Sequence, residues 1–401
     1  MSKLLKILGI IGFVAVTCLS QHGTASADDG PFTCSSSFFQ VISGQLKSLN
    51  PVTGAYTNIG SNAGFDYNAI GYNVLDNYIY GIIHNGANSG DLVRIGSDGT
   101  TTDLGLPAGL PRATYVNGSF DLAGNLYING PSQTVYKVNV STMTATTLTI
   151  TGDAIVDGFD NVVIGNNMYL LVGDTLSVVN LNTDVDTNVT VSGPAGWLTA
   201  GGDFGAGWSD QAGELFFSNN ETGSIYQISD LDSPTPTATF KVTGTVTSDN
   251  DGTDCSLAAQ SPFDPPVAIN DSYTTTYNTP LKETTTPLLS NDIGNSLTVT
   301  SNTNPAHGTV SVNPDGTFSY TPARGFSGTD SFGYTVTDAY GRTASATVTI
   351  TVSPAAKAPD TGFGEPEASS AWVMIGMRSA LSVILTVLGL RLWKNFRTSS
   401  K

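Results

Sequence analysis

The chain has 401 residues, of which 12% are charged, and its formal net charge at pH 7 is −17. Residues 28–361 keep nine of the 16 Lys and Arg residues and 31 of the 33 Asp and Glu residues, a net charge of −22. Such an acidic surface argues against nucleic acid and anionic lipid headgroups as partners and suits cations. Abundant Thr, Ser, Asn and Gly favour strands and turns over helices.

Residues 1–27 are predicted to be a secretory signal peptide. The segment begins with two lysines, continues with an apolar core over residues 7–19 and ends on the small residues Ala25, Ser26 and Ala27. We therefore expect the chain to be exported.

Two cysteines, Cys34 and Cys255, remain after removal of the signal peptide. In an oxidising exterior a lone pair usually forms a disulfide, which here would close a loop of about 220 residues. The alternative is two free thiols. The length of the exported part suggests two domains, and a proline cluster at Pro262, Pro265 and Pro266 marks the boundary between them.

Residues 34–258 contain a repeated unit. An aromatic residue that follows a turn recurs at spacings of 47, 42 and 47 residues, at Tyr80, Tyr127, Tyr169 and Phe216. An apolar residue before a second turn recurs at spacings of 46, 43, 43 and 47 residues, at Leu49, Ile95, Val138, Leu181 and Ile228. A period of about 40 to 50 residues with four short strands is typical of a β-propeller blade.

The second motif predicts five blades, with six as the alternative. The first repeat lacks an inner strand before Phe38, and a spare strand around Asp254 can supply it. The first and last strands of the repeat region would then pair, and a disulfide between Cys34 and Cys255 would hold this junction, which we call the seam. The segments Trp208-Ser209-Asp210 and Ile225-Tyr226-Gln227-Ile228 resemble uncharacterised repeat domains of bacterial surface proteins. This resemblance implies a fold and no known activity.

Four aspartates lie beside a phenylalanine where blades are predicted to begin. They are Asp66, Asp121, Asp160 and Asp203. A residue repeated in each blade is expected to bind backbone amides at the start of a strand. The alternatives are a ring of carboxylates that binds a metal or ligand, or a glycosidase site, which needs two facing carboxyl groups. His84 and His307 lie far apart in sequence, so a histidine-based catalytic site is poorly supported.

Residues 265–353 predict an immunoglobulin-like β-sandwich, because apolar and polar residues alternate over about seven short strands. Motifs such as Leu288-Leu289-Ser290-Asn291-Asp292 and Gly328-Thr329-Asp330-Ser331-Phe332 resemble cadherin-like domains of bacterial surface proteins. The resemblance implies a possible Ca²⁺ site at Asp271, Asp292, Asp330 and Asp338. The alternative is that these aspartates only form turns. The segment Asp249-Asn250-Asp251-Gly252-Thr253-Asp254 is a weaker calcium-loop candidate, because the EF-hand spacing is incomplete.

The C-terminal part is predicted to hold the protein at the cell envelope. A linker, residues 354–370, contains the motif 358–362, and a transmembrane helix, 371–390, precedes a basic cytoplasmic tail, 391–401. The motif residues are Ala358, Pro359, Asp360, Thr361 and Gly362. This order resembles sortase sorting signals, in which a sortase joins the threonine carbonyl to a cell-wall amine. Ala358 stands where the family motif has Leu, and an uncleaved membrane anchor is the alternative.

These features together predict an all-β exported protein with a propeller, a sandwich and one C-terminal membrane helix. We expect a non-enzymatic surface protein, anchored to the wall or membrane, that takes part in adhesion or binds an extracellular protein or glycan through the propeller. The alternatives are a surface carbohydrate-active enzyme that uses propeller carboxylates and a structural envelope component. Adhesion follows from analogy of architecture alone.

Overall fold

The computed structural model describes residues 30–156, 158, 160–198, 202–247, 250–258 and 260–355. The internal contacts divide the chain into two units, residues 1–354 and 355–401. The predicted signal peptide, sorting motif, membrane helix and basic tail lie outside the described residues. Within the described ranges, no helix has the length and apolar character needed to cross a bilayer.

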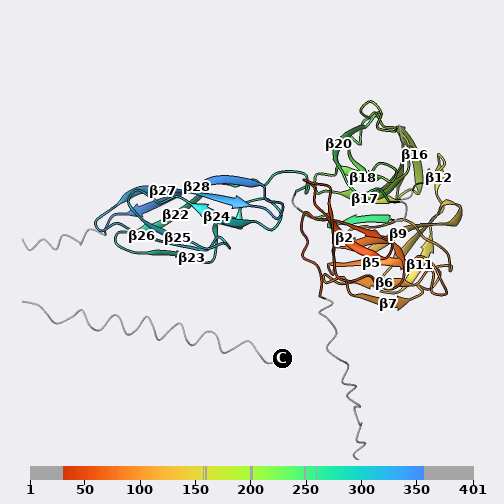
Figure 1. Cartoon of the computed structure of the whole chain (residues 1–401), viewed down its shortest axis with the longest axis horizontal. Coiled ribbons are helices and arrows are strands. Elements are labelled where there is room, and N and C mark those ends of the chain that lie inside the picture. Colours follow the sequence, from red (N-terminus) through yellow and green to blue (C-terminus); the bar gives the residue numbers. More distant parts are fainter. Residues whose placement is uncertain are drawn as a thin grey trace, which may run out of the picture. The chain divides into compact units, whose positions relative to one another are not determined.

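The first part of the described chain forms five sheets of short antiparallel strands (Figure 1). The first sheet contains β1 (Phe38–Ile42), β2 (Gln45–Leu49), β3 (Tyr56–Asn58) and β21 (Asn250–Asp254). The second contains β4 (Tyr67–Asn73), β5 (Tyr78–Ile83), β6 (Leu92–Ile95) and β7 (Thr101–Gly105). The third contains β8 (Gly118–Phe120), β9 (Asn125–Gly130), β10 (Thr134–Asn139) and β11 (Thr144–Thr147), with the 3₁₀ turn η1 (Pro131–Gln133) between β9 and β10.

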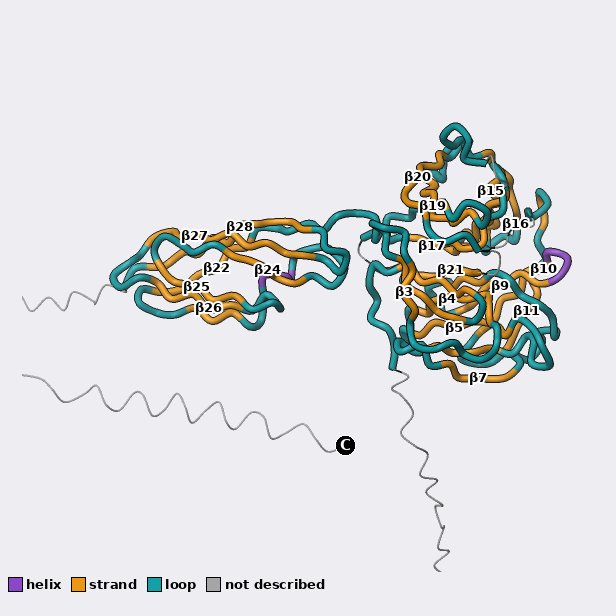
Figure 2. The backbone as a smooth tube through the Cα atoms, in the orientation of Figure 1, coloured by secondary structure: helices purple, strands orange, loops and turns teal. Residues whose placement is uncertain are grey.

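Two more sheets complete this region. The fourth contains β13 (Asn161–Ile164), β14 (Asn167–Val172), β15 (Thr175–Asn180) and β16 (Val185–Thr190), and β12 (Thr151–Gly152) pairs in parallel with β16. The fifth contains β17 (Phe204–Ser209), β18 (Leu215–Asn219), β19 (Ser224–Ser229) and β20 (Thr237–Thr243). Figure 2 shows the loops that connect the strands.

The innermost strands of these sheets contact one another in a circular order. β4 contacts β8, β8 contacts β13, β13 contacts β17, β17 contacts β21, and β21 contacts β4. A separate apolar cluster fills the space between each pair of neighbouring sheets. Sheets arranged around an axis in this way form a β-propeller, as the sequence period predicted.

The seam between the first and last strands is formed as predicted. β21 pairs in antiparallel fashion with β1, with Phe38 opposite Asp254 and Ile42 opposite Asn250. Cys34 and Cys255 form a disulfide, and their Cα atoms lie 5.4 Å apart across a sequence separation of 221 residues. Trp208 of β17 also contacts the seam, where its indole N–H donates a 2.7 Å hydrogen bond to the Phe39 carbonyl.

The repeat is confirmed with one correction in its fourth unit. Leu49, Ile95, Val138 and Ile228 are buried near the ends of the third strands counted from the axis, as their spacing predicted. In the fourth unit the equivalent residue is Val179 of β15, which is fully buried, whereas Leu181 lies in the following turn. The side chain of Asn180 accepts hydrogen bonds from the N–H groups of Asn182 and Thr183, so the turn begins two residues earlier than predicted.

The second domain is a sandwich of seven described strands, as predicted. One sheet has the order β22 (Asp271–Thr276), β28 (Thr343–Ser353), β27 (Gly328–Thr337) and β24 (Thr298–Asn302). The other has the order β23 (Leu281–Glu283), β26 (Phe318–Pro322) and β25 (Gly308–Val312), and a 3₁₀ turn η2 (Leu288–Ser290) follows β23 in sequence.

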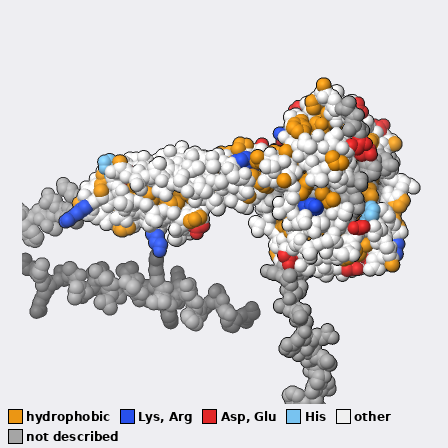
Figure 3. Space-filling model, in the orientation of Figure 1, with side chains coloured by type: hydrophobic (Ala, Val, Ile, Leu, Met, Phe, Trp, Pro, Cys, Tyr) orange, Lys and Arg blue, Asp and Glu red, His pale blue; other side chains and the backbone are white. Residues whose placement is uncertain are grey.

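Buried and exposed residues alternate along β27 and β28, which gives the larger sheet one apolar face and one polar face. Phe332, Tyr334, Val348 and Ile350 point into the core and are nearly inaccessible to solvent. The residues between them on these strands are mostly Ser and Thr and lie on the outer face. In the view of Figure 3, most of the sandwich surface is neither charged nor hydrophobic.

Candidate ligand-binding funnel

Two buried aspartates lie where the inner strands meet. Asp160 comes directly before β13, Asp251 lies in β21, and both are fully buried. Asp160 accepts hydrogen bonds from the backbone N–H groups of Asn161 (2.6 Å), Gly252 (3.0 Å) and Gly207. Asp251 accepts hydrogen bonds from the N–H groups of Ile70 and Gly252. The pair therefore connects β4, β13, β17 and β21.

Asn117, which comes directly before β8, adds the third sheet to this connection. Its side-chain oxygen accepts hydrogen bonds from the Asn161 amide group (2.9 Å) and the Asn129 backbone N–H (2.8 Å). Asn117, Asp160 and Asp251 form an axial polar cluster that joins the inner strands by side chains.

The axial cluster holds protons at neutral pH. Burial raises the pKa of Asp160 to about 7. Burial also raises the pKa of Asp251 well above its ordinary value, and the charge of Asp160 together with a hydrogen bond between the two carboxyl groups raises it further. Because two adjacent buried carboxylates repel each other, the pair shares a proton. Burial raises the pKa of Asp254, further along β21, to about 8.

A narrow neck runs along the inner strands from this cluster. Its volume is about 10 Å³, room for about one water molecule. Gly207, Gly252 and Asp254 line it, and the Asp254 carboxyl group accepts a 3.0 Å hydrogen bond from the Ser209 N–H. Phe120, Val163, Ser209 and Ser256 line both this neck and a wider pocket, so the two hollows are adjacent.

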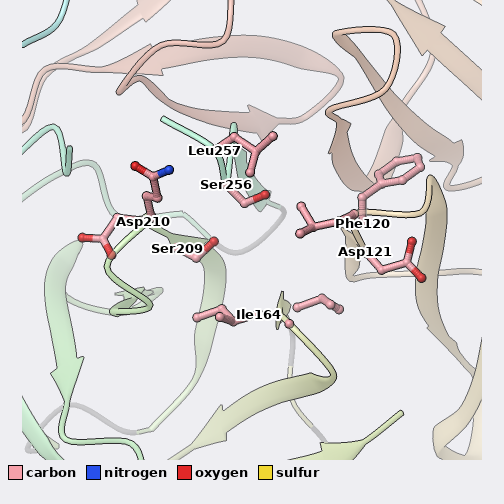
Figure 4. Close-up of a pocket in the computed structure, with 11 residues that line it drawn as sticks. Phe120, Asp121, Ile164, Ser209, Asp210, Ser256 and Leu257 are labelled. Carbon is pink, nitrogen blue, oxygen red and sulfur yellow. The ribbon is translucent and has the colours of Figure 1, made fainter. Parts of the chain in front are cut away.

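The wider pocket, which we call the funnel mouth, has a volume of about 180 Å³. Asp121 and Asp210 lie on opposite sides of it in Figure 4, with Ile164 and Leu257 between them. The full lining consists of Phe120, Asp121, Leu122, Val163, Ile164, Gly165, Ser209, Asp210, Gln211, Ser256 and Leu257. Of these eleven described residues, two are acidic and none is basic.

Turns after the inner strands place the two acidic residues. Asp121 follows β8 and accepts hydrogen bonds from the N–H groups of Ala123 and Asn125, both at 2.9 Å. Asp210 follows β17 and accepts a 3.0 Å hydrogen bond from the Glu214 N–H. The shared sequence, Asp-x-Ala-Gly, was the signal that could have identified Asp210 as the counterpart of Asp121.

The four aspartates predicted to ring the axis do not form one site. Asp160 reaches the axis and Asp121 lies at the funnel mouth, after its strand rather than before it. Asp66 accepts a 3.0 Å hydrogen bond from the side chain of Asn85, and Asp203 precedes β17 and bridges to Val172 through its backbone. The metal or catalytic ring is therefore wrong, whereas the predicted bonding to backbone amides is confirmed for Asp121 and Asp160.

Comparison with known proteins identifies the repeat region. Residues 38–257, more than half of the chain, match a family described as "Repeat of unknown function (DUF6923)". The chain belongs to this family. Residues 263–351 match a family described as "Bacterial Ig domain". A DUF6923 repeat followed by a bacterial Ig domain fits an extracellular or envelope protein.

Solved structures resemble the chain at low identity, and no curated protein matches it in sequence. A structure described as "Structure of U3-55K" has 12% identity and a TM-score of 0.31, and covers 50% of this chain and 59% of that one. "YCF48 bound to D1 peptide" has 12% identity, a TM-score of 0.31 and coverages of 45% and 55%. "YCF48 from Cyanidioschyzon merolae" has 12% identity, a TM-score of 0.33 and coverages of 47% and 61%. The chain thus spans less than two thirds of those chains.

The weaker calcium-loop candidate in the DUF6923 repeat is not a loop. Residues Asn250–Asp254 form β21, whose backbone pairs with β1. Alternating side chains of a strand point to opposite faces, so this segment cannot wrap around one ion as an EF-hand loop does. The EF-hand interpretation is wrong because Asp251 and Asp254 belong to the innermost strand of a sheet, while Asp249 lies outside the described residues.

The four carboxylates predicted to bind calcium in the Ig domain separate into three places. Asp271 and Asp292 meet near the hydroxyl group of Tyr334, which donates to Asp292 at 3.0 Å. Asp330 accepts hydrogen bonds from the N–H groups of Ala306 and His307, and Asp338 accepts one from the Arg342 side chain at 2.7 Å. No group of three or more metal-ligating His, Cys, Asp or Glu side chains occurs among the described residues.

The two histidines among the described residues, His84 and His307, lie in separate domains. The ring of His307 stacks on Phe326 with a centroid distance of 4.4 Å. His84 lies after β5, and its Nδ1 is 3.3 Å from the Tyr115 carbonyl oxygen.

Proposed function

We propose that this chain is an exported protein that stays at the cell envelope and binds an extracellular partner through the funnel mouth of its DUF6923 repeat. The bacterial Ig domain and the disulfide support a location outside the cytoplasm. The single observation that carries the binding role is the funnel mouth itself, a hollow of about 180 Å³ with apolar walls and two carboxylates. A purely structural envelope component does not need such a hollow.

The repeat is proposed to be a five-bladed propeller. Five sheets, five apolar clusters between them and a circular order of inner-strand contacts support this number over six. The order of motif, apolar run and basic tail in residues 358–401 supports a sortase substrate that is joined to a cell-wall amine through Thr361.

We propose a binding role rather than catalysis because the carboxylates of the axis are engaged in other contacts. Glycosidases place two carboxyl groups about 5 to 9.5 Å apart on either side of a bound sugar. Asp160 and Asp251 instead share a hydrogen bond, are fully buried and accept backbone N–H groups. Asp121 at the mouth has both oxygens in hydrogen bonds of its own turn.

The proposed function is tested with the purified full chain on two arrays, one of glycans and one of short peptides, and on bacterial and host cell surfaces. Binding to at least one array, reduced by the change Leu122→Ser at the mouth, is the expected result, because this change removes apolar contact area without altering the charge. Leu122 is 53% exposed, so this change should leave folding intact. Binding that Leu122→Ser leaves unchanged would place the ligand elsewhere, and turnover of an array glycan would favour the enzyme alternative.

A further inference from the structure

The funnel mouth is small and its walls carry two kinds of chemistry. Pockets for drug-sized ligands usually measure about 300 to 1,000 Å³, whereas this one measures about 180 Å³. The neck behind it, at about 10 Å³, stops anything larger than water from passing further. The mouth therefore suits one long side chain of a larger partner rather than a whole oligosaccharide unit with its substituents.

The two charged side chains that line the mouth, Asp121 and Asp210, are both acidic and lie on opposite sides of it. The negative charge of Asp264 acts on Asp210, and Glu214 lies close enough to interact with both. Burial raises the pKa of Asp210, and Asp264 adds to this effect. A cation in the mouth would offset this repulsion, whereas a carboxylate or phosphate would add to it. Charge complementarity thus selects a basic group.

The rim of the mouth is apolar and accessible. Leu122 and Leu257 are 53% and 47% exposed, although they are large aliphatic side chains. Aliphatic side chains around an acidic hollow fit the methylene stem of a lysine or arginine, whose head reaches the carboxylates while the stem packs on the rim.

From these observations we propose that the funnel mouth captures a lysine or arginine side chain of a protein partner, with an apolar neighbour in the partner resting on Leu122 and Leu257. This inference rests on the proposed binding function and specifies its ligand. The groove that continues from Leu122 past Tyr127, Lys137 and Asn166 gives an extended partner segment a path away from the mouth.

The test measures fluorescence polarisation with the full chain, purified in mild detergent, at about physiological salt. The probes are labelled short Gly-Ser peptides with a central Leu-Lys, Leu-Arg or Leu-Gln pair. We expect the two basic peptides to bind at least about tenfold more tightly than the glutamine peptide, and their affinity to fall as salt is raised.

Matched variants locate the binding. Asp210→Asn removes the charge, and its amide oxygen can still accept the Glu214 N–H, so the turn is kept. Asp232→Asn, at an exposed position in the turn between β19 and β20, removes the same charge away from the mouth. We expect Asp210→Asn to weaken binding of the basic peptides at least about fivefold and Asp232→Asn to leave it unchanged.

The outcomes separate this inference from the function on which it rests. Equal binding of the glutamine peptide, or equal loss in both variants, would show a non-specific charge effect and overturn the inference. Glycan binding that Leu122→Ser weakens, without any preference for basic peptides, would overturn the inference and leave the proposed function in place. Failure on both arrays would overturn both.

Discussion

The propeller should lose stability as the pH rises from about 5 to 8. Burial raises the pKa of Asp160 to about 7, and those of Asp251 and Asp254 are raised as well, the latter to about 8. The folded domain therefore binds more protons than the unfolded chain in this range. Since the stability falls with pH wherever the folded state holds the extra protons, the sign is opposite to that of most salt-bridged proteins.

The size of the effect can be worked out for one of these groups, Asp160, which gives its minimum. Between its ordinary value of 3.8 and about 7, Asp160 alone changes the free energy of unfolding by about 1.4 kcal/mol per pH unit, or about 4 kcal/mol in total. For a domain of this size, about 1 kcal/mol corresponds to about 2 to 4 °C in Tm. We therefore expect Tm to fall by about 3 to 6 °C for each pH unit.

Thermal and urea unfolding followed by tryptophan fluorescence would measure this. In a chain that ends at residue 354, the tryptophans are Trp197 and Trp208, both in the propeller, so the signal excludes the Ig domain. The change Asp251→Asn removes the second carboxyl group, and its amide can donate to Asp160. The pH slope should then fall by about 1.4 kcal/mol per unit, while the exposed Asp103→Asn should keep the original slope.

Two results would refute the reasoning. A Tm that rises between pH 5 and pH 8 would mean that the axial carboxyl groups are ionised in the folded domain. An unchanged slope in Asp251→Asn would mean that the protons are bound elsewhere.

Three further predictions concern the seam and the C-terminus. Replacing Cys34 and Cys255 by serine should destabilise the propeller by up to about 5 kcal/mol, because the disulfide closes a loop of 221 residues. Urea unfolding with and without reductant measures this effect, and equal unfolding midpoints of the oxidised and reduced protein would contradict it. Trp208→Phe should cost about 1 to 3 kcal/mol by removing the hydrogen bond to the Phe39 carbonyl and leaving a cavity, as circular dichroism melts would show. Mass spectrometry of envelope fractions should find Thr361 as the mature C-terminus; peptides that continue through Gly362 in most copies would indicate an uncleaved anchor.

The parts of the fold that sequence could predict are those encoded by local periodicity. The regular spacing of aromatic residues predicted the repeat, and the unpaired strand near Cys255 predicted the seam. Both could be predicted because each pattern lies within one blade or at one end of the repeat region. The fourth repeat was misplaced by two residues because Asn180 and Asn182 are both good turn formers. Only the register of β15 with its neighbours makes Asn180 the one that starts the turn.

The candidate site was harder to predict because its residues come from different blades. Asp160 and Asp251 are 91 positions apart, and each lies in a segment rich in Asp, Asn and Gly that resembles a turn. Their meeting depends on how neighbouring inner strands are staggered, which the sequence of one strand does not specify. Likewise Asp121 and Asp160 each follow a phenylalanine in the sequence, yet Asp121 comes after strand β8 whereas Asp160 comes before strand β13.

The closure of the first sheet by β21 also sets the order in which the molecule can be completed. A chain that emerges N-terminus first presents β1, β2 and β3 long before residues 250–254 arrive, so the first sheet keeps an open edge for most of that time. Pairing across more than 200 residues is slow, because the entropy of loop closure is lost before the contact is gained. The last strand of the propeller to appear is thus the one that completes the first sheet. Oxidation of Cys34 with Cys255 then links the two ends of the closed ring covalently.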